Sequence, residues 1–313
     1  MTLSRRTFLW TTTAGLVALK PGSFAKEHTG ATEIAITMDD PKPDTLAGMP
    51  GSEINRRILS TLATARVQAA LFVTGMRIDN GAGKALIHDW DAAGHEICNH
   101  TYSHQSYNSP QVGYENFAGD FLKDEPLIHE SRHFTRRFRF PFLKEGDTAV
   151  KRDRFRGLLR EHGYRIGHVT VDASDWYIDA RMRKRLEKEP SSDTAPYRDY
   201  YVAHMRDRAR YYRQLARDVL GHNIRHTVLI HHNLLNALYL GDMMRTLQED
   251  GWKWVDAQHA FRDPVFTREP KIVPAGESLV WALAKESGRF EDRLRYPGED
   301  GEYEKAKMDA LGL

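Results

Sequence analysis

The sequence lacks the features that mark several large classes of protein. It has one cysteine, Cys98, in 313 residues, so no disulfide can form within the chain, and we expect this thiol to be a buried structural residue. Its formal net charge is only +2, too close to neutral to indicate binding to nucleic acid. No glycine-rich phosphate-binding loop follows the first predicted strand, which argues against a nucleotide-binding fold. With 41% hydrophobic and 28% charged residues, the chain can still bury a sizeable core.

The first 25 residues are predicted to be an export signal and not part of the fold. Arg5 and Arg6 precede an apolar run, Phe8 to Leu19, which is shorter than the roughly 20 residues that a membrane-spanning helix needs. Small residues around Ala25 suit cleavage by a signal peptidase. Because the segment resembles a twin-arginine signal, we expect the twin-arginine (Tat) export machinery to be a partner and the mature chain to have no stable membrane anchor. The protein would then act in the periplasm or outside a bacterial cell.

Strand-like and helix-like segments alternate at least six times between residues 26 and 262. Strands are predicted at 33–38, 68–74, 95–99, 137–140, 164–171, 227–230 and 252–256. Helices are predicted at 52–67, with Ser52 as its N-cap, and at 84–93, 148–162 and 239–250, with Gly94 and Gly163 ending the second and third. This alternation predicts an α/β fold in which parallel strands and helical crossovers form a closed or partly closed barrel.

Two segments do not follow this alternation. Residues 177–226 are long, charged and helical in pattern, and we interpret them as a helical insertion in the barrel domain, 26–262. Residues 263–313 are rich in proline, glycine and aromatic residues, and we expect them to form a C-terminal extension packed on the barrel.

Polar clusters stand where the predicted strands end. They read TMDD at 37–40, HTYSH at 100–104, RFPF at 139–142, DASDW at 172–176 and LIHH at 229–232. An α/β barrel gathers its catalytic groups at the carboxyl ends of its strands, so we expect these clusters to meet. Carboxylates, imidazoles and one arginine together indicate a metal-dependent hydrolase.

The clusters supply a ligand set for one divalent cation. On a helical turn, the spacing of His100 and His104 would place both imidazoles on one face. One carboxylate from Asp39 or Asp40 would complete a three-ligand site with room for water, while the other carboxylate acts as a base. Arg139 would orient that base and hold its pKa down. Taken singly, each of these residues is also typical of ordinary surface or core positions.

The five clusters, in this order, resemble the NodB-like polysaccharide deacetylases, carbohydrate esterase family 4. The resemblance implies a distorted (β/α) barrel and a divalent metal, most often Zn²⁺ with Co²⁺ or Ni²⁺ as alternatives. It implies that the metal ligands are Asp40, His100 and His104. It further implies that Asp39 is the general base, oriented by Arg139, and that His231 is the general acid, oriented by Asp175. In the same resemblance, the backbone N–H of Phe142 stabilises the oxyanion and Trp176 lines the acyl pocket.

The chain departs from the family pattern at a few positions. Pro41 replaces a glycine, which stiffens the first loop, and His232 beside His231 leaves two candidates for the acid, of which we favour His231. The resemblance implies removal of N-acetyl, or O-acetyl, groups from a glycan or oligosaccharide that contains N-acetylglucosamine. The insertion and the C-terminal extension keep two alternatives open, a metal-dependent amidase or esterase for a small non-sugar substrate and a non-catalytic exported glycan-binding protein.

Overall fold

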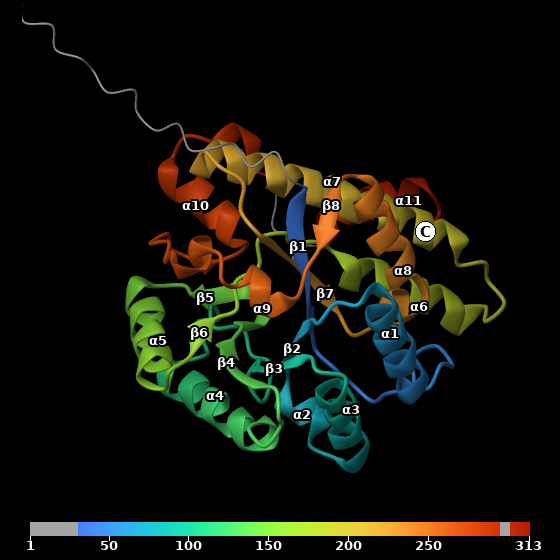
Figure 1. Cartoon of the computed structure of the whole chain (residues 1–313), viewed down its shortest axis with the longest axis horizontal. Helices are drawn as coiled ribbons and strands as arrows, with labels where there is room; N and C mark the ends of the chain where they lie inside the picture. The colour runs from blue at the N-terminus through green and yellow to red at the C-terminus, as the bar shows by residue number, and fades with distance from the viewer. Residues whose placement is uncertain (1–30, 295–300) are drawn as a thin grey trace, which may run out of the picture.

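The computed structural model describes residues 31–294 and 301–313, and it shows a curled sheet wrapped by helices (Figure 1). The predicted export signal, residues 1–25, lies outside the described residues. The sheet contains β1 (Thr32–Asp39), β2 (Ala70–Val73), β3 (Glu96–Asn99), β4 (Phe134–Phe138), β6 (Arg165–Ile166), β7 (His226–His231) and β8 (Trp252–Trp254). Their order is β6-β4-β3-β2-β1-β7, with β8 pairing the first residues of β1. All of these pairs are parallel, as predicted.

Residues 165–171 connect the β4 side of the sheet with β7 at its other edge. At the start of this segment β6 pairs with β4, and at its end Val171 pairs with Val228 in β7. The space inside the ring is narrow, because a Cβ atom on Gly167 would lie 2.4 Å from the Phe72 ring. The predicted strand at 164–171 is therefore split between two partners. The predicted distorted (β/α) barrel, closed or partly closed, is confirmed in the form of a curled parallel half-barrel.

Side-chain alternation along β1 separates the barrel interior from the outer core. Ile34, Ile36 and Met38 belong to the large core that includes residues of the surrounding helices. Ala35 instead packs with Phe72 and Cys98 in a smaller cluster. Burial raises the pKa of the Cys98 thiol well above its usual value, so the expectation of a buried structural cysteine is confirmed.

The crossover helices match the sequence predictions in place but not at every end. They are α1 (Gly51–Ala65), α3 (Gly81–Ala92), α5 (Ala149–Glu161) and α8 (Leu234–Glu249). Gly94 and Gly163 adopt positive φ just after their helices, as expected of C-terminal stops. Ser52 is not the cap of α1, because the helix already begins at Gly51. The sequence analysis also missed α4 (Tyr114–Ile128), in which Pro126 interrupts the helical pattern.

The predicted insertion forms two helices, α6 (Asp175–Lys188) and α7 (Ala195–Leu220), so it starts two residues earlier than expected. After α9 (Ala257–Ala260), residues of the C-terminal segment return to the barrel. There β9 (Ala275–Gly276) pairs antiparallel with β5 (Lys144–Gly146), and α10 (Leu279–Ser287) packs on α7. The remaining connections contain the short helical turns α2 (Gly75–Ile78), η1 (Pro141–Leu143), η2 (Pro264–Thr267) and η3 (Glu291–Arg293). The last element is the helix α11 (Glu302–Ala310).

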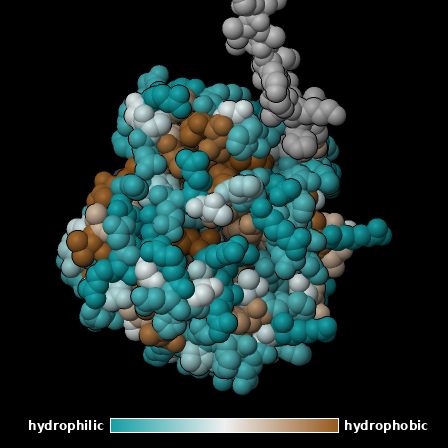
Figure 2. All heavy atoms as spheres, turned by 60° about the vertical axis from the view of Figure 1, so that its left-hand side comes forward, coloured by the Kyte–Doolittle hydropathy of each residue, from teal (hydrophilic) through white to brown (hydrophobic). Residues whose placement is uncertain are grey.

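The face turned forward in Figure 2 is mostly hydrophilic, with several separate apolar patches. Among the described residues, no helix combines the length and the apolar character needed to cross a bilayer.

The three buried histidines His168, His226 and His232 predict that the fold loses stability in mild acid. Burial lowers the pKa of His168 and His232 to about 4 and that of His226 to about 3. Between pH 6.5 and 4 the unfolded chain therefore binds more protons than the folded chain, so the free energy of unfolding falls as the pH falls. We expect a loss of about 1–2 kcal/mol for each histidine between pH 7 and pH 5.

Urea denaturation at the two pH values, with a chelator present, measures this loss. His226→Gln should weaken the pH dependence, whereas the same change at the exposed His88 should not. A free energy of unfolding that stays constant from pH 7 to pH 5 would contradict the expectation.

Candidate active site

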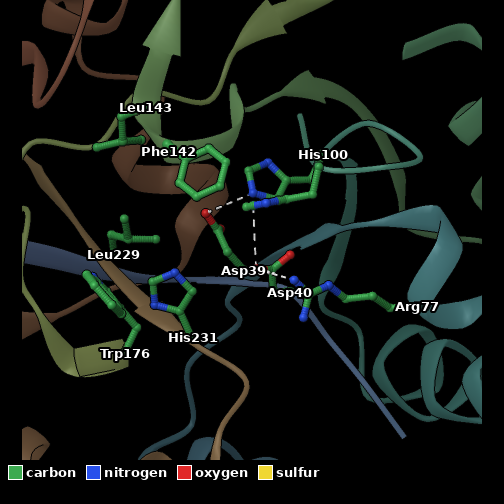
Figure 3. Close-up of a pocket in the computed structure, with 10 residues that line it drawn as sticks. Asp39, Asp40, Arg77, His100, Phe142, Leu143, Trp176, Leu229 and His231 are labelled. Atoms are coloured by element: carbon green, nitrogen blue, oxygen red, sulfur yellow. Dashed lines mark ion pairs between the residues drawn. The ribbon is translucent and has the colours of Figure 1, made fainter. Parts of the chain in front are cut away.

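The clusters predicted to meet at the carboxyl ends of the strands do line one pocket, with a volume of about 260 Å³ (Figure 3). Its lining residues are Asp39, Asp40, Arg77, His100, His104, Phe142, Leu143, Trp176, Leu229 and His231. Titratable groups and apolar side chains therefore share a space of about the size of one sugar unit.

Both aspartates face this pocket because the backbone turns at the end of β1. Asp39 is the last residue of the strand and pairs with His231 across the sheet. Asp40 has a φ of 61°, a left-handed conformation that is unusual for a residue with a side chain. This turn cancels the alternation of an extended strand, so consecutive carboxylates lie on the same side. Thr74 then donates a hydrogen bond of 2.6 Å to Asp40 Oδ1.

His100 and His104 approach each other through a loop, so the expectation of a helical turn is wrong. Thr101 and His104 both have positive φ, and the Thr101 hydroxyl accepts a hydrogen bond from the His104 backbone N–H. The centroids of the two imidazole rings lie 4.9 Å apart. Such backbone conformations cost energy and persist where the surroundings enforce them, often at functional sites.

Asp40, His100 and His104 form a group of ligand atoms that suits a divalent metal ion. One atom from each residue lies within 4.8 Å of the others. His100 Nδ1 lies 2.8 Å from the Arg139 carbonyl oxygen, which can only accept, so Nδ1 carries the proton and Nε2 keeps its lone pair. Burial lowers the pKa of both imidazoles, which favours their neutral, ligating form. Two nitrogens and a carboxylate oxygen are the donor set of an open zinc site.

The neighbouring carboxylate, Asp39, is buried and paired with Arg139. Arg139 is 1% exposed, and its Nη1 donates a 2.6 Å hydrogen bond to Asp39 Oδ1. Its Nε donates to the Gly167 carbonyl, and its guanidinium lies over the Phe72 ring. Burial raises the pKa of Asp39 to about 6, because desolvation outweighs the lowering by Arg139. Arg139 thus contacts Asp39 and favours its charged form, but the expectation that it holds the pKa of Asp39 down is wrong, because that pKa lies above its ordinary value.

On the opposite side of the pocket, His231 is fixed by a buried carboxylate. Its Nδ1 lies 2.8 Å from Asp175 Oδ1, and its backbone N–H donates to Asp175 Oδ2. The side-chain amides of Asn233 and Asn236 also donate to that carboxylate. Although burial raises the pKa of Asp175, these hydrogen bonds and the His231 charge outweigh it and hold the pKa below its usual value.

The alternation of β7 decides between the two adjacent histidines. His231 shares the pocket with Asp39, whereas the side chain of His232 is directed outward and lies 3.3 Å from Asn55 in α1. The structure therefore brings His231, and not His232, together with the other polar residues of the pocket.

Phe142 and Trp176 contribute to the apolar part of the wall. Phe142 is 41% exposed, has a φ of 56° and packs its ring edge on His104. Trp176 is the second residue of α6. A Cβ atom on Gly301 would lie 2.9 Å from the Trp176 ring, so the C-terminal segment supports this side chain from behind.

A hydrogen-bonded chain from the last helix reaches the start of α6. Tyr200 donates to Glu304 in α11, and the same carboxylate oxygen lies 3.5 Å from His204 Nδ1. His204 Nε2 accepts a hydrogen bond from the Ser174 backbone N–H, next to Asp175. Helices α7 and α11 therefore hold the start of α6, the helix that carries Asp175 and Trp176.

Some residues of the site were given no role by the sequence analysis. Arg77 lines the pocket and follows the end of β2, where the strand-end argument applied to the other clusters would have found it. Leu229 precedes His231 by two positions in β7 and therefore faces the same side. Nothing in the local sequence distinguishes Asn233 and Asn236, because their role depends on Asp175, which is far away in the chain.

Comparisons with known proteins agree with this fold. Residues 26–167 match the family model described as "Polysaccharide deacetylase". No curated protein matches the chain. A CE4 esterase from Streptococcus mutans is 16% identical over 72% of this chain and 86% of its own, with a TM-score of 0.50. The peptidoglycan deacetylase PdaC from Bacillus subtilis is 19% identical, covering 74% and 90%, with a TM-score of 0.48. BA3943, a CE4 family pseudoenzyme from Bacillus anthracis, is 18% identical, covering 74% and 66%, with a TM-score of 0.49.

The fold is thus the NodB-like (β/α) barrel of the CE4 enzymes. Because residues 26–167 match that family model, the resemblance found in the sequence is confirmed.

Proposed function

We propose that the protein is a metal-dependent hydrolase that removes acetyl groups, chiefly N-acetyl groups, from a glycan or oligosaccharide containing N-acetylglucosamine. One observation carries the proposal. A buried aspartate, a three-ligand metal group and a carboxylate-bound histidine face the same 260 Å³ pocket from different sides. A protein that only bound glycans would not need this set of a base, an acid and ligands.

Asp40, His100 and His104 would hold the divalent cation, which when bound polarises the acyl carbonyl and lowers the pKa of water. Zinc suits this donor set best, and Co²⁺ or Ni²⁺ are alternatives. Asp39, with a pKa of about 6, is mostly ionised at neutral pH and still close enough to it to act as an efficient base.

The chain's own groups carry the proton transfers. Asp39, held by Arg139, takes a proton from the attacking water as the new C–O bond forms. The Phe142 backbone N–H stabilises the negative charge that develops on the acyl oxygen. His231, held by Asp175 at Nδ1, gives a proton from Nε2 to the departing nitrogen as the C–N bond breaks. Acetate and a free amino sugar result, and Trp176 lines the wall against which the acetyl methyl group packs.

The place of action follows from the sequence rather than from the described residues. The paired arginines before the apolar run support export of the folded protein by the twin-arginine machinery. Residues 1–25 would be removed, leaving a barrel domain, 26–262, with its insertion at 177–226 and its extension at 263–313.

Acetate release tests the function directly. Purified protein should release acetate from N-acetylglucosamine oligomers, should lose this activity after dialysis against a chelator, and should regain it with Zn²⁺ or Co²⁺. Metal analysis should find about one equivalent of divalent metal. The His104→Ala variant should bind this metal with an affinity at least tenfold lower. A panel of small amides and esters serves as the comparison. No acetate from any acetylated glycan, with metal bound, would refute the proposal.

A further inference from the structure

The position of Arg77 at the pocket is fixed by backbone contacts of the helical turn that carries it. It lies in α2, whose Gly75 and Met76 N–H groups donate to the carbonyls of Thr101 and Tyr102. A Cβ atom on Gly75 would lie 2.8 Å from the Tyr102 ring, so α2 packs tightly on the loop that carries His100 and His104. The loop and the arginine therefore keep a fixed relation to each other.

The guanidinium points at the oxygen that belongs to the metal group. Arg77 Nη2 lies 3.3 Å from Asp40 Oδ2, and the same oxygen lies 3.5 Å from His104 Nε2. Asp40 Oδ1 is already the acceptor for Thr74. A metal cation bound by Asp40 would therefore share one carboxylate oxygen with the Arg77 guanidinium.

Charge in the loaded pocket would then be unbalanced. Asp39 is paired with Arg139, and the Asp175 carboxylate is stabilised by its hydrogen bonds with His231 and two amides. Asp40 alone would face both a divalent cation and the Arg77 guanidinium. A dication and a guanidinium that share one carboxylate oxygen repel each other, and this repulsion is stronger in a partly buried pocket than in water. An anionic group on the ligand would relieve it.

The shape of the pocket gives such a group a place. Arg77 lies on the side opposite His231 and Trp176 (Figure 3). Its side chain is 31% exposed, so an incoming group can reach it without displacing a buried residue. The acyl group would lie against Leu229 and Trp176, while another substituent of the same sugar faces Arg77.

We infer that Arg77 is a specificity residue and that the preferred substrate carries an oxyanion, a carboxylate or a phosphate, on the sugar whose acetyl group is removed. This inference rests on the proposed function. Arginine forms paired hydrogen bonds with such groups, which a lysine cannot reproduce.

The test compares three substrates of equal length: a neutral N-acetylglucosamine trimer, the trimer with a lactyl carboxylate on the target sugar, and the trimer with a 6-phosphate there. The wild-type protein should show a kcat/KM at least tenfold higher for one of the two anionic forms, and which form it is identifies the oxyanion. Arg77→Gln should reduce this preference at least tenfold, Arg77→Lys should restore only part of it, and the exposed Arg57→Gln should leave it unchanged.

Binding gives a readout that does not depend on turnover. Calorimetry with Asp39→Asn protein, loaded with Zn²⁺, should show tighter binding of the preferred anionic trimer than of the neutral trimer, and Arg77→Gln in that background should remove the difference. Metal analysis of each variant separates a loss of metal from a loss of substrate. Equal kcat/KM for all three substrates, or equal losses for all of them in Arg77→Gln, would overturn the inference. Anion-selective binding through Arg77 without acetate release would instead refute only the proposed function.

Discussion

Replacing Asp39 with asparagine should lower kcat for acetate release by about 10²–10⁴-fold, the usual contribution of a general base. The amide that replaces the carboxylate keeps the size of the side chain but cannot accept a proton from water. The metal content should stay close to that of the wild-type protein, because Asp40, His100 and His104 remain. Steady-state kinetics and metal analysis on the same preparation provide the two measurements.

Asp44→Asn is the matched control, since it makes the same chemical change at an exposed position outside the pocket. Its kcat should remain within a fewfold of the wild-type value. If kcat of Asp39→Asn were also within a fewfold of the wild-type value, another group would be the base. Loss of metal in Asp39→Asn would instead show that Asp39 is a ligand.

Replacing Arg139 with methionine should destabilise the fold by about 3–5 kcal/mol, because it leaves the buried Asp39 carboxylate without its partner. The same change removes the hydrogen bond to the Gly167 carbonyl, which joins β4 to the segment that closes the barrel. Urea denaturation of the metal-free protein at pH 7 measures the loss. Arg154→Met, which breaks an exposed pair with Glu115, should cost at most about 1 kcal/mol.

A double variant identifies the cause of the loss. Asp39→Leu combined with Arg139→Met removes both charges, and we expect it to be more stable than Arg139→Met alone, because no unpaired charge is then buried. If the double variant is instead less stable than Arg139→Met, the packing of Arg139 on Phe72 and its bond to Gly167 are the main contributions, and the ion pair is not.

The two variants also separate the effect of the buried ion pair on stability from its effect on the charge state of Asp39. Desolvation raises the pKa of Asp39 and Arg139 opposes it, so the pair keeps a carboxylate ionised where burial alone would protonate it. In this arrangement the arginine maintains a reactive charge state, and its removal costs stability because the carboxylate is left unpaired. That explains why the stability and activity effects of Arg139 need separate measurements.

The alternation of strands and helices was predictable from the sequence because it depends on local periodicity. Segments such as 33–38 and 95–99 are short, apolar and β-branched or flanked by turn residues, so their type and parallel pairing could be inferred. The same reasoning placed the polar clusters at strand ends. It failed for α4, where Pro126 lies within the helix, and at β6, whose segment is divided between two partners.

The arrangement of the site depended on more than local pattern. The loop of His100 and His104 and the turn at Asp40 use positive φ in residues other than glycine, which the surrounding structure must enforce. The choice of His231 over His232 required the register of β7 against β1, in which Asp39 and His231 are partners.

By itself, the sequence determined the barrel class and the chemical groups available at its carboxyl end, since both follow from periodicity and residue type. Only the tertiary structure decided which of those groups meet, that Arg77 joins them, and that α7 and α11 support α6. The physical reason is that these contacts join residues far apart in the chain, so their geometry depends on strand register and packing across the whole barrel.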